Sequence, residues 1–407
     1  MKKSSLTCLM AMAAIAPLAL TACGGGSSQA AASEKVDSLT VLDYYNNEPD
    51  KTHIQGALDK CAAQLGVTLK RETVPGKDLI QKVLQRSSSR TLPDVLMLDN
   101  PDVQEIAATG GLAPLDDFGV DTSGFAQGML DAATYEGKVY GLAPTANTLG
   151  LFYNKEMLAA AGIQPPKTWD ELKAAASKLT TGDRYGLAFS AIATYEGSWQ
   201  FLPFMWTNGG EETDLKSPKV AEALGFVDGL VASGSASKSV VNWSQADVRD
   251  QFAAGKAAMM INGPWQIPSL AKTPNIKWEA VQVPVNAQGQ TPVAPLGGEV
   301  WTVPQTGNRA KQAKSAELVA CISSDENQLA LAKERFTVPT KTALAGEHVK
   351  AVPEMAAFTE QVANAQSRTG KLGKEWPKTA TVIYTAIQLA LTDQASPQEA
   401  FTKAEAK

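Results

Sequence analysis

Amides, carboxylates and large aromatic rings gather where apolar segments of the chain end. They include Tyr45 and Asn46, Asp99, Trp199, Trp265, and Glu299 with Trp301. Sugar hydroxyls need planar donors and acceptors, which amide and carboxylate groups supply. The apolar face of a pyranose ring needs a flat aromatic surface that loses little conformational entropy. This mixture of side chains therefore indicates a binding site for a sugar.

The tryptophans differ in how strongly the sequence favours contact with a ligand. Trp265 stands on a turn directly after an apolar segment, so we expect it to bind rather than to pack in the core. For Trp199, Trp301 and Trp376, the residue pattern leaves stacking on a ligand and packing in the core equally open. With Trp265, we choose Trp199 and Trp301 as the expected stacking residues.

Motifs of the common catalytic and metal sites are missing from the sequence. It holds no His-Glu-x-x-His, no Cys-x-x-Cys, no Gly-x-Ser-x-Gly and no Gly-x-x-x-x-Gly-Lys. His53 and His348 have no companions at metal-ligand spacing, and we expect both at the surface. Acidic residues are plentiful, but nothing singles out two of them as the carboxylate pair of a glycosidase. We therefore expect no catalytic residue, no metal ion and no cofactor.

The chain alternates between segments with strand and helix patterns, and so belongs to the α/β class. Strands are predicted at 38–44, 67–73, 94–98, 185–189, 257–261 and 300–304. Helices are predicted at 51–66, 76–87, 244–254, 310–323 and 379–391. The alternation predicts a mostly parallel sheet covered on both faces, with ligands bound beyond the carboxyl ends of the strands.

The first residues have the pattern of an export signal. Lys2 and Lys3 precede an apolar stretch that is too short to span a bilayer, and the stretch ends in Leu20-Thr21-Ala22-Cys23. The string resembles the bacterial lipobox, so we predict a signal peptide over residues 1–22 and lipidation of Cys23. Residues 23–35 are rich in Gly, Ser and Ala and are predicted to form a flexible tether on the extracytoplasmic face of the cell membrane.

Composition limits the kinds of partner. The 407 residues carry a formal charge of −5, which becomes about −7 when Lys2 and Lys3 leave with the signal. An acidic chain without a basic cluster argues against nucleic acid. After export, Cys61 and Cys321 are in an oxidising compartment, where a disulfide and two unpaired buried thiols are both open.

Several strings resemble one known family, the family 1 extracellular solute-binding proteins, which are the sugar receptors of ABC importers. The central string is Leu151-Phe152-Tyr153-Asn154-Lys155-Glu156-Met157-Leu158, followed by Pro165-Pro166-Lys167-Thr168-Trp169-Asp170-Glu171-Leu172. Phe252-Ala253-Ala254-Gly255-Lys256, Asn262-Gly263-Pro264-Trp265, Gly297-Gly298-Glu299 and Arg335-Phe336-Thr337-Val338-Pro339 resemble later blocks of the family. Together these strings cover nearly all of the chain that follows the signal.

The resemblance implies a two-lobed periplasmic-binding-protein-like fold with a hinge between the lobes and the ligand in the cleft. The N-lobe would comprise residues 36–146 and 298–341, and the C-lobe residues 150–294 and 346–407. A monomer, a carbohydrate ligand and a membrane permease as partner are the family's expectations. Hinge closure requires ligand contacts from both lobes.

The resemblance also assigns roles to single residues. Trp265 matches the family's stacking tryptophan, and Trp376 lies close to a C-terminal stacking aromatic. Asn147 falls where maltose-binding protein, a family member, has a sugar-contacting glutamate, which argues against a maltose-type ligand. Asp99 falls on the loop that grips sugar hydroxyls. Tyr45, Asn46 and Glu299 are expected to form hydrogen bonds to the ligand.

The sequence therefore predicts a lipid-anchored receptor that binds a mono- or oligosaccharide without changing it. A binding protein for a polyamine, peptide or phosphate ester is the alternative, and Arg335 is the residue that leaves an anionic ligand open. A surface-anchored glycoside hydrolase is a third hypothesis from a different class of protein.

Overall fold

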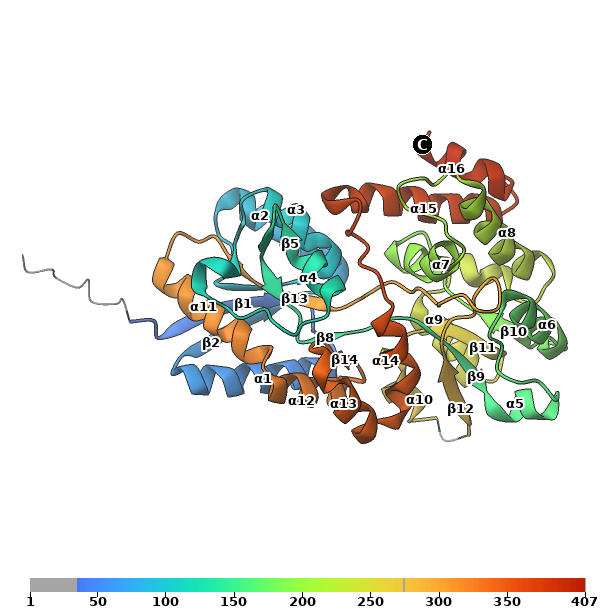
Figure 1. Ribbon diagram of the computed structural model, residues 1–407, viewed down its shortest axis with the longest axis horizontal. Coiled ribbons are helices and arrows are strands. Elements are labelled where there is room, and N and C mark those ends of the chain that lie inside the picture. The colour runs from blue at the N-terminus through green and yellow to red at the C-terminus, as the bar shows by residue number, and fades with distance from the viewer. Residues whose placement is uncertain (1–34, 274, 407) are drawn as a thin grey trace, which may run out of the picture. The chain divides into compact units, whose positions relative to one another are not determined.

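Two β-sheets organise the part of the chain that the computed structural model describes, residues 35–273 and 275–406 (Figure 1). The first sheet has the order β2-β1-β3-β13-β4, and β7 also pairs with β13. Its strands are β1 (Ser38–Asp43), β2 (Thr68–Thr73), β3 (Val95–Asp99), β4 (Leu112–Ala113), β7 (Gly141–Leu142) and β13 (Glu299–Pro304). The second sheet has the order β10-β11-β9-β12, formed by β9 (Gly150–Asn154), β10 (Tyr185–Ala188), β11 (Ala257–Asn262) and β12 (Trp278–Val281).

Both sheets are mixed, so the prediction of a mostly parallel sheet is wrong. β1 is parallel to β2 and β3, and β10 is parallel to β11, but β13 is antiparallel to β3 and β9 is antiparallel to β11. The cause is the way the chain passes between the sheets. β13 and β9 both begin where the chain enters a sheet, so Glu299 pairs with Asp99 and Gly150 with Asn262. The start of each entering strand therefore lies beside the carboxyl end of its neighbour.

Helices cover the sheets, as the alternating pattern predicts. Packed around the first sheet are α1 (Asp50–Leu65), α2 (Gly76–Ser89), α3 (Val103–Ala108), α4 (Gln127–Ala133), α11 (Arg309–Ile322) and α12 (Asp325–Arg335). Packed around the second are α5 (Lys155–Ala160), α6 (Trp169–Leu179), α7 (Tyr195–Thr207), α8 (Pro218–Ala232), α9 (Gln245–Ala253), α10 (Ile267–Leu270), α14 (Ala356–Ala363), α15 (Trp376–Leu391) and α16 (Pro397–Glu405). A further helix, α13 (Ala345–Ala351), packs against α12.

The helix α1 illustrates how the sequence pattern produces these elements. Its apolar residues recur at helical spacing, and Ile54, Leu58 and Cys61 are fully buried against the first sheet. The helix ends where Gly66 takes a left-handed conformation with φ 67°, which costs glycine no side-chain strain. The observed bounds agree with the predicted range 51–66 to within one residue at each end.

The chain passes between the two sheets in extended segments that pair with one another. β8 (Thr145–Ala146) is antiparallel to β14 (Val338–Pro339), and the next residue, Asn147, bridges to Gly297. From Val36 onward the described chain forms one compact unit. Each sheet draws its strands from the ranges predicted for one lobe, while the exact lobe boundaries stay a prediction.

The predicted export signal lies beyond what the structure covers. The signal peptide over residues 1–22, Cys23 and the tether up to residue 34 are outside the described residues. Among the helices of the described part, none is both long and apolar enough to cross a membrane. The lipid anchor therefore stays a prediction.

A disulfide joins Cys61 of α1 to Cys321 of α11, with an S–S distance of 2.06 Å. Of the two alternatives that the sequence leaves open, the structure thus has the covalent bond. The helices lie side by side over the first sheet (Figure 1) although the cysteines are 260 residues apart in the chain. The bond closes a loop that contains most of the protein, including every strand of the second sheet.

Replacing both cysteines, Cys61→Ser with Cys321→Ser, is expected to lower the stability by about 2–5 kcal/mol, because the unfolded chain regains the freedom that the cross-link removes. Thermal unfolding of the parent and the double variant measures the difference. Addition of a reductant should shift the parent toward the variant and leave the variant unchanged. Equal melting temperatures for the oxidised parent and the variant would contradict the expectation.

Candidate ligand-binding site

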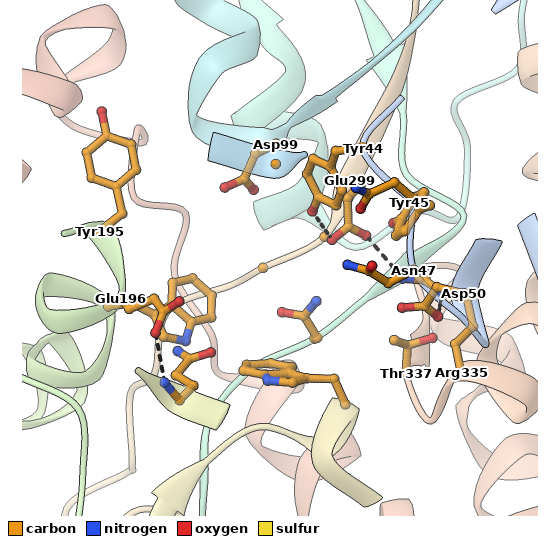
Figure 2. Close-up of a pocket in the computed structure, with 18 of the residues that line it drawn as sticks. Tyr44, Tyr45, Asn47, Asp50, Asp99, Tyr195, Glu196, Glu299, Arg335 and Thr337 are labelled. Atoms are coloured by element: carbon orange, nitrogen blue, oxygen red, sulfur yellow. Dashed lines mark hydrogen bonds and ion pairs between the residues drawn. The ribbon is translucent and has the colours of Figure 1, made fainter. Parts of the chain in front are cut away.

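A cavity of about 460 Å³ lies at the strand ends where the chain passes between the two sheets. Its size falls in the range of small-molecule sites. Figure 2 shows Tyr44, Tyr45 and Glu299 on one wall, with Tyr195 and Glu196 on the other. Eight predicted ligand-binding residues line it: Tyr45, Asn46, Asp99, Asn147, Trp199, Trp265, Glu299 and Arg335. The structure therefore brings these residues together, and their contact with a ligand stays a prediction.

Two of the predicted stacking residues do not reach this cavity. Trp301 is 1% exposed in the interior of β13, where it packs with Val41 and Met97 beneath the helices of the first sheet. Trp376 is also 1% exposed, in the core around α15. The predicted stacking roles of both tryptophans are wrong, because both side chains belong to hydrophobic cores.

The predicted surface position of His348 is wrong as well. Its side chain is buried on α13, and burial lowers the pKa of the imidazole. His53 is partly exposed, and its Nδ1 lies 3.1 Å from Glu334. Within the described residues, no group of three or more His, Cys, Asp or Glu side chains is placed to hold a metal ion.

Further lining residues were not chosen from the sequence. They are Tyr44, Asn47, Asp50, Tyr195, Glu196, Gln245, Thr337 and Arg368, together with three glycines. Tyr44 and Asn47 flank the chosen Tyr45 and Asn46, so their position at a strand end was a usable signal. Arg368 gave no such signal, because it lies in an irregular segment that is far along the chain from any strand of the two sheets.

The first wall is held by a buried ion pair below it. Asp43, at the end of β1, is fully buried and accepts hydrogen bonds from Arg71 Nε at 2.7 Å and Nη2 at 2.9 Å. The same carboxylate accepts from the backbone N–H of Tyr45 at 2.8 Å. A paired and hydrogen-bonded buried charge fixes its surroundings. The Asp43–Arg71 pair therefore sets the path of the segment that carries Tyr44 and Tyr45 into the cavity.

Glu299 is the central acceptor of this wall. The hydroxyl of Tyr44 donates to Glu299 Oε1 at 2.6 Å, and Arg335 Nη2 lies 3.9 Å from Oε2. Burial, together with the charge of Glu299, holds the pKa of Tyr44 well above its usual value. Tyr44 therefore stays a hydrogen-bond donor throughout the physiological pH range.

The opposite wall presents two tryptophan rings. Trp199 comes from α7 and Trp265 from the turn after β11. The ring of Trp265 lies over Gly263, where an added Cβ would come within 2.0 Å of it. The Gly-Pro-Trp turn therefore needs glycine at this position, because any larger residue would displace the ring. Nearby, Glu196 accepts from the backbone N–H of Gln245 at 2.8 Å, which fixes the start of α9.

The floor consists of the paired crossing segments. Asn147 N–H donates to the carbonyl of Gly297 at 3.0 Å, and Gly297 N–H donates back to Asn147 at 2.8 Å. A Cβ on Gly297 would approach Asn147 Oδ1 to 2.0 Å and the Trp199 ring to 2.8 Å. The side chains of Asn147 and Trp199 can therefore reach the cavity only because residue 297 is glycine.

Both guanidinium groups in the lining are already paired with carboxylates. Arg335 Nε donates to Asp50 Oδ1 at 2.8 Å, and its Cζ lies 4.5 Å from the centroid of the Tyr45 ring. Arg368 Nη2 donates to Asp99 Oδ1 at 3.1 Å. With Glu196 and Glu299 also in the lining, four carboxylates face two guanidiniums. The cavity therefore carries an excess of two negative charges when all six groups are ionised.

A cavity between two mixed α/β halves, lined by aromatic and hydrogen-bonding side chains, is typical of a binding protein for a small molecule. Comparison with known sequences agrees. Residues 56–357 match the family described as bacterial extracellular solute-binding protein. The chain belongs to this family, and the resemblance seen in the sequence is confirmed. Members of the family are binding proteins that act outside the cytoplasm.

Relatives that match over most of this chain include oligosaccharide-binding proteins. The chain is 25% identical to a maltooligosaccharide ABC transporter solute-binding lipoprotein of Streptococcus pneumoniae, over 83% of this chain and 80% of that protein. It is 24% identical to a galactooligosaccharide-binding protein of Bacillus subtilis, over 99% and 96%. Among solved structures, the GacH receptor of Streptomyces glaucescens, studied with acarbose, is similar with a TM-score of 0.79 and 26% identity, over 91% and 97%. The two-lobed periplasmic-binding fold is confirmed by these neighbours.

Asp102 lies one turn beyond Asp99, the last residue of β3. Its carboxyl group makes the stability of the folded protein depend on pH. Desolvation by burial, followed by the charge of Asp99, raises the pKa of Asp102 from 3.8 to about 8. The folded protein then keeps a proton that the unfolded chain has already released between about pH 4 and pH 8. Stability contributed by this group therefore falls as the pH rises through that window.

We expect Asp102→Asn to weaken this decline, because the amide cannot ionise. Melting temperatures measured from pH 5 to about pH 8.5 should fall less steeply for the variant than for the parent. Asp183→Asn, which changes an exposed aspartate on a turn, serves as the control and should follow the parent. Identical slopes for all three proteins would mean that Asp102 ionises normally in the folded state.

Proposed function

We propose that this protein is the extracytoplasmic receptor of an ABC importer, and that it binds a mono- or oligosaccharide and delivers it to a membrane permease. The observation that carries the proposal is that two tryptophan rings, Trp199 and Trp265, lie across the cavity from hydrogen-bonding groups such as Asn46 and Glu299. A sugar ring offers an apolar face to the first and hydroxyls to the second. The sugar-binding relatives support the same reading.

The proposal gives each side chain a role. Trp199 and Trp265 are the stacking platforms, and Tyr45, Asn46, Asp99, Asn147 and Glu299 are the hydrogen-bonding groups. Because these residues come from elements that pack around the first sheet and around the second, a bound sugar favours closure of the two lobes by contact with each. The predicted division of the lobes, at 36–146 with 298–341 and at 150–294 with 346–407, belongs to this proposal.

The charges of the lining favour a neutral ligand over an anion. A phosphate ester would need a free guanidinium or a helix N-terminus, whereas Arg335 and Arg368 are both engaged by carboxylates. The excess of negative charge would also repel a phosphate. Arg335 is therefore assigned to holding the wall rather than to binding an anionic solute.

The remaining assignments complete the proposal. Lipidation at Cys23 would anchor the protein to the membrane through the tether 23–35, and a monomer would present its ligand to the permease. We propose no catalytic activity. A glycoside hydrolase would release new reducing ends from an oligosaccharide, and a receptor would return the sugar unchanged.

A thermal-shift screen tests the proposal directly. The protein from residue 24 onward is melted with maltotriose, galactobiose, glucose, spermidine, a tripeptide and glycerol 3-phosphate. A ligand at 100 times its Kd adds about 2.7 kcal/mol of stability. A rise in melting temperature with a sugar, and no new reducing ends, supports the receptor. A rise with spermidine, the tripeptide or the phosphate ester alone would overturn the assignment to a sugar.

Trp265→Ala is expected to weaken binding of the sugar found in that screen by about 2 kcal/mol, which is roughly thirtyfold. The apo protein should melt close to the parent, because the ring stands at the cavity rather than in a closed core. Isothermal titration measures the affinity. Trp278→Ala is the matched control, since Trp278 is also half-buried but lies outside this cavity. A similar loss of affinity in both variants would contradict a stacking role for Trp265.

A further inference from the structure

Arg368 contacts the first wall of the cavity from a segment that belongs to neither sheet. It lies between α14 and α15, and its side chain is only 5% exposed. Its Nη2 donates to Asp99 Oδ1 and to Asn100 Oδ1, both at 3.1 Å. Asp99 is the last residue of β3 and Asn100 follows it, so the guanidinium holds the carboxyl end of a strand in the first sheet.

The same guanidinium contacts the opposite wall. Its Cζ lies 4.5 Å from the centroid of the Trp199 ring, at the distance of a cation–π contact. Trp199 belongs to α7, whose apolar residues pack around the second sheet. One buried side chain therefore touches Asp99 on one wall and Trp199 on the other.

The backbone around Arg368 is tied to the crossing segment. Leu296 N–H donates to the carbonyl of Gln366 at 2.8 Å, and Gln366 N–H donates to the carbonyl of Ala294 at 2.9 Å. Asn100 Nδ2 also donates to the carbonyl of Leu296 at 3.0 Å. Arg368 is thus held beside the chain that passes between the sheets, and its position follows that passage.

We propose that Arg368 is a positioning residue that couples Asp99 to Trp199 and so sets the spacing of a hydrogen-bonding group and a stacking ring before any ligand arrives. This role rests on the proposed function, because the spacing of Asp99 and Trp199 matters for binding only if the cavity holds a sugar. The coupling itself is a property of the ligand-free protein. Arginine suits this role because its planar guanidinium can form hydrogen bonds at its edge while its face lies on a ring.

A lysine at this position is expected to keep only the first of these two contacts. An ammonium group is a compact charge that can pair with Asp99 but cannot stack a planar face on Trp199. Arg368→Lys is therefore expected to keep the electrostatic coupling to Asp99 and to lose the effect on the ring. Arg368→Gln is expected to lose both. This split separates a positioning residue from one that only fills space.

A double-mutant cycle in the ligand-free protein tests the first contact. Thermal unfolding is measured for Asp99→Asn, Arg368→Gln and the double variant. Each single change leaves a charge without its partner, so the double variant should lose less in melting temperature than the sum of the two single losses. Additive losses would overturn the proposed coupling between Asp99 and Arg368.

The emission of Trp199 tests the second contact. In the parent background, the fluorescence of this ring is the emission spectrum of the parent minus that of Trp199→Phe. In the Arg368→Gln background, it is the spectrum of Arg368→Gln minus that of the double variant that carries both Arg368→Gln and Trp199→Phe. The two difference spectra should differ, and the Arg368→Lys background should resemble the Gln background. Arg309→Gln is the matched control, because Arg309 stacks over Phe118 at 4.1 Å and does not line the cavity, so its loss should leave the Trp199 spectrum unchanged. A Trp199 spectrum that ignores position 368 would overturn the proposal.

The double-mutant cycle and the Trp199 spectra are both measured without a ligand. They therefore test the role of Arg368 even if no sugar raises the melting temperature in the screen. If the screen identifies a sugar, Arg368→Gln should weaken its binding by about tenfold or more. Unchanged affinity for that sugar would overturn the positioning role even where the cycle shows coupling.

Discussion

The close pairing of the two crossing segments at Asn147 and Gly297 is the constraint on which the cavity depends. Reciprocal backbone hydrogen bonds of 3.0 and 2.8 Å hold the segments together. The approach leaves no room for a side chain at residue 297, since a Cβ would meet Asn147 Oδ1 at 2.0 Å. The pairing therefore fixes the base of the site.

The direction of each strand follows from the same passage. Because β13 and β9 start at the crossing, their first residues, Glu299 and Gly150, lie beside the carboxyl ends of β3 and β11, and Glu299 lines the cavity. An antiparallel strand places its first residue, not its last, at the edge where its parallel neighbours have their carboxyl ends. In β13 that first residue is Glu299, the acceptor for Tyr44. The mixed topology therefore adds a carboxylate to the site.

The rule that ligands bind beyond strand ends was enough to choose Asp99 and Trp265, which line one cavity, from the sequence, and the helical period gave the bounds of α1 closely. The same rule failed for Trp301, because it does not say how deep along a strand the helices begin to cover the side chains. Arg368 could not be found, since its contact with Asp99 joins positions 269 residues apart without a local pattern. The disulfide stayed open for the same reason: spacing in the chain does not give distance in space.

Burying charged groups in the wall of a binding site is costly unless each charge has a partner. Arg335 meets this requirement through Asp50 and the Tyr45 ring, and Arg368 meets it through Asp99 and the Trp199 ring. Each guanidinium thus has a carboxylate at its edge and an aromatic face beside it. A wall built this way keeps strong, oriented dipoles without an uncompensated positive charge. Its carboxylate and amide acceptors can form hydrogen bonds, whereas an anion would meet two guanidiniums that are already paired with carboxylates.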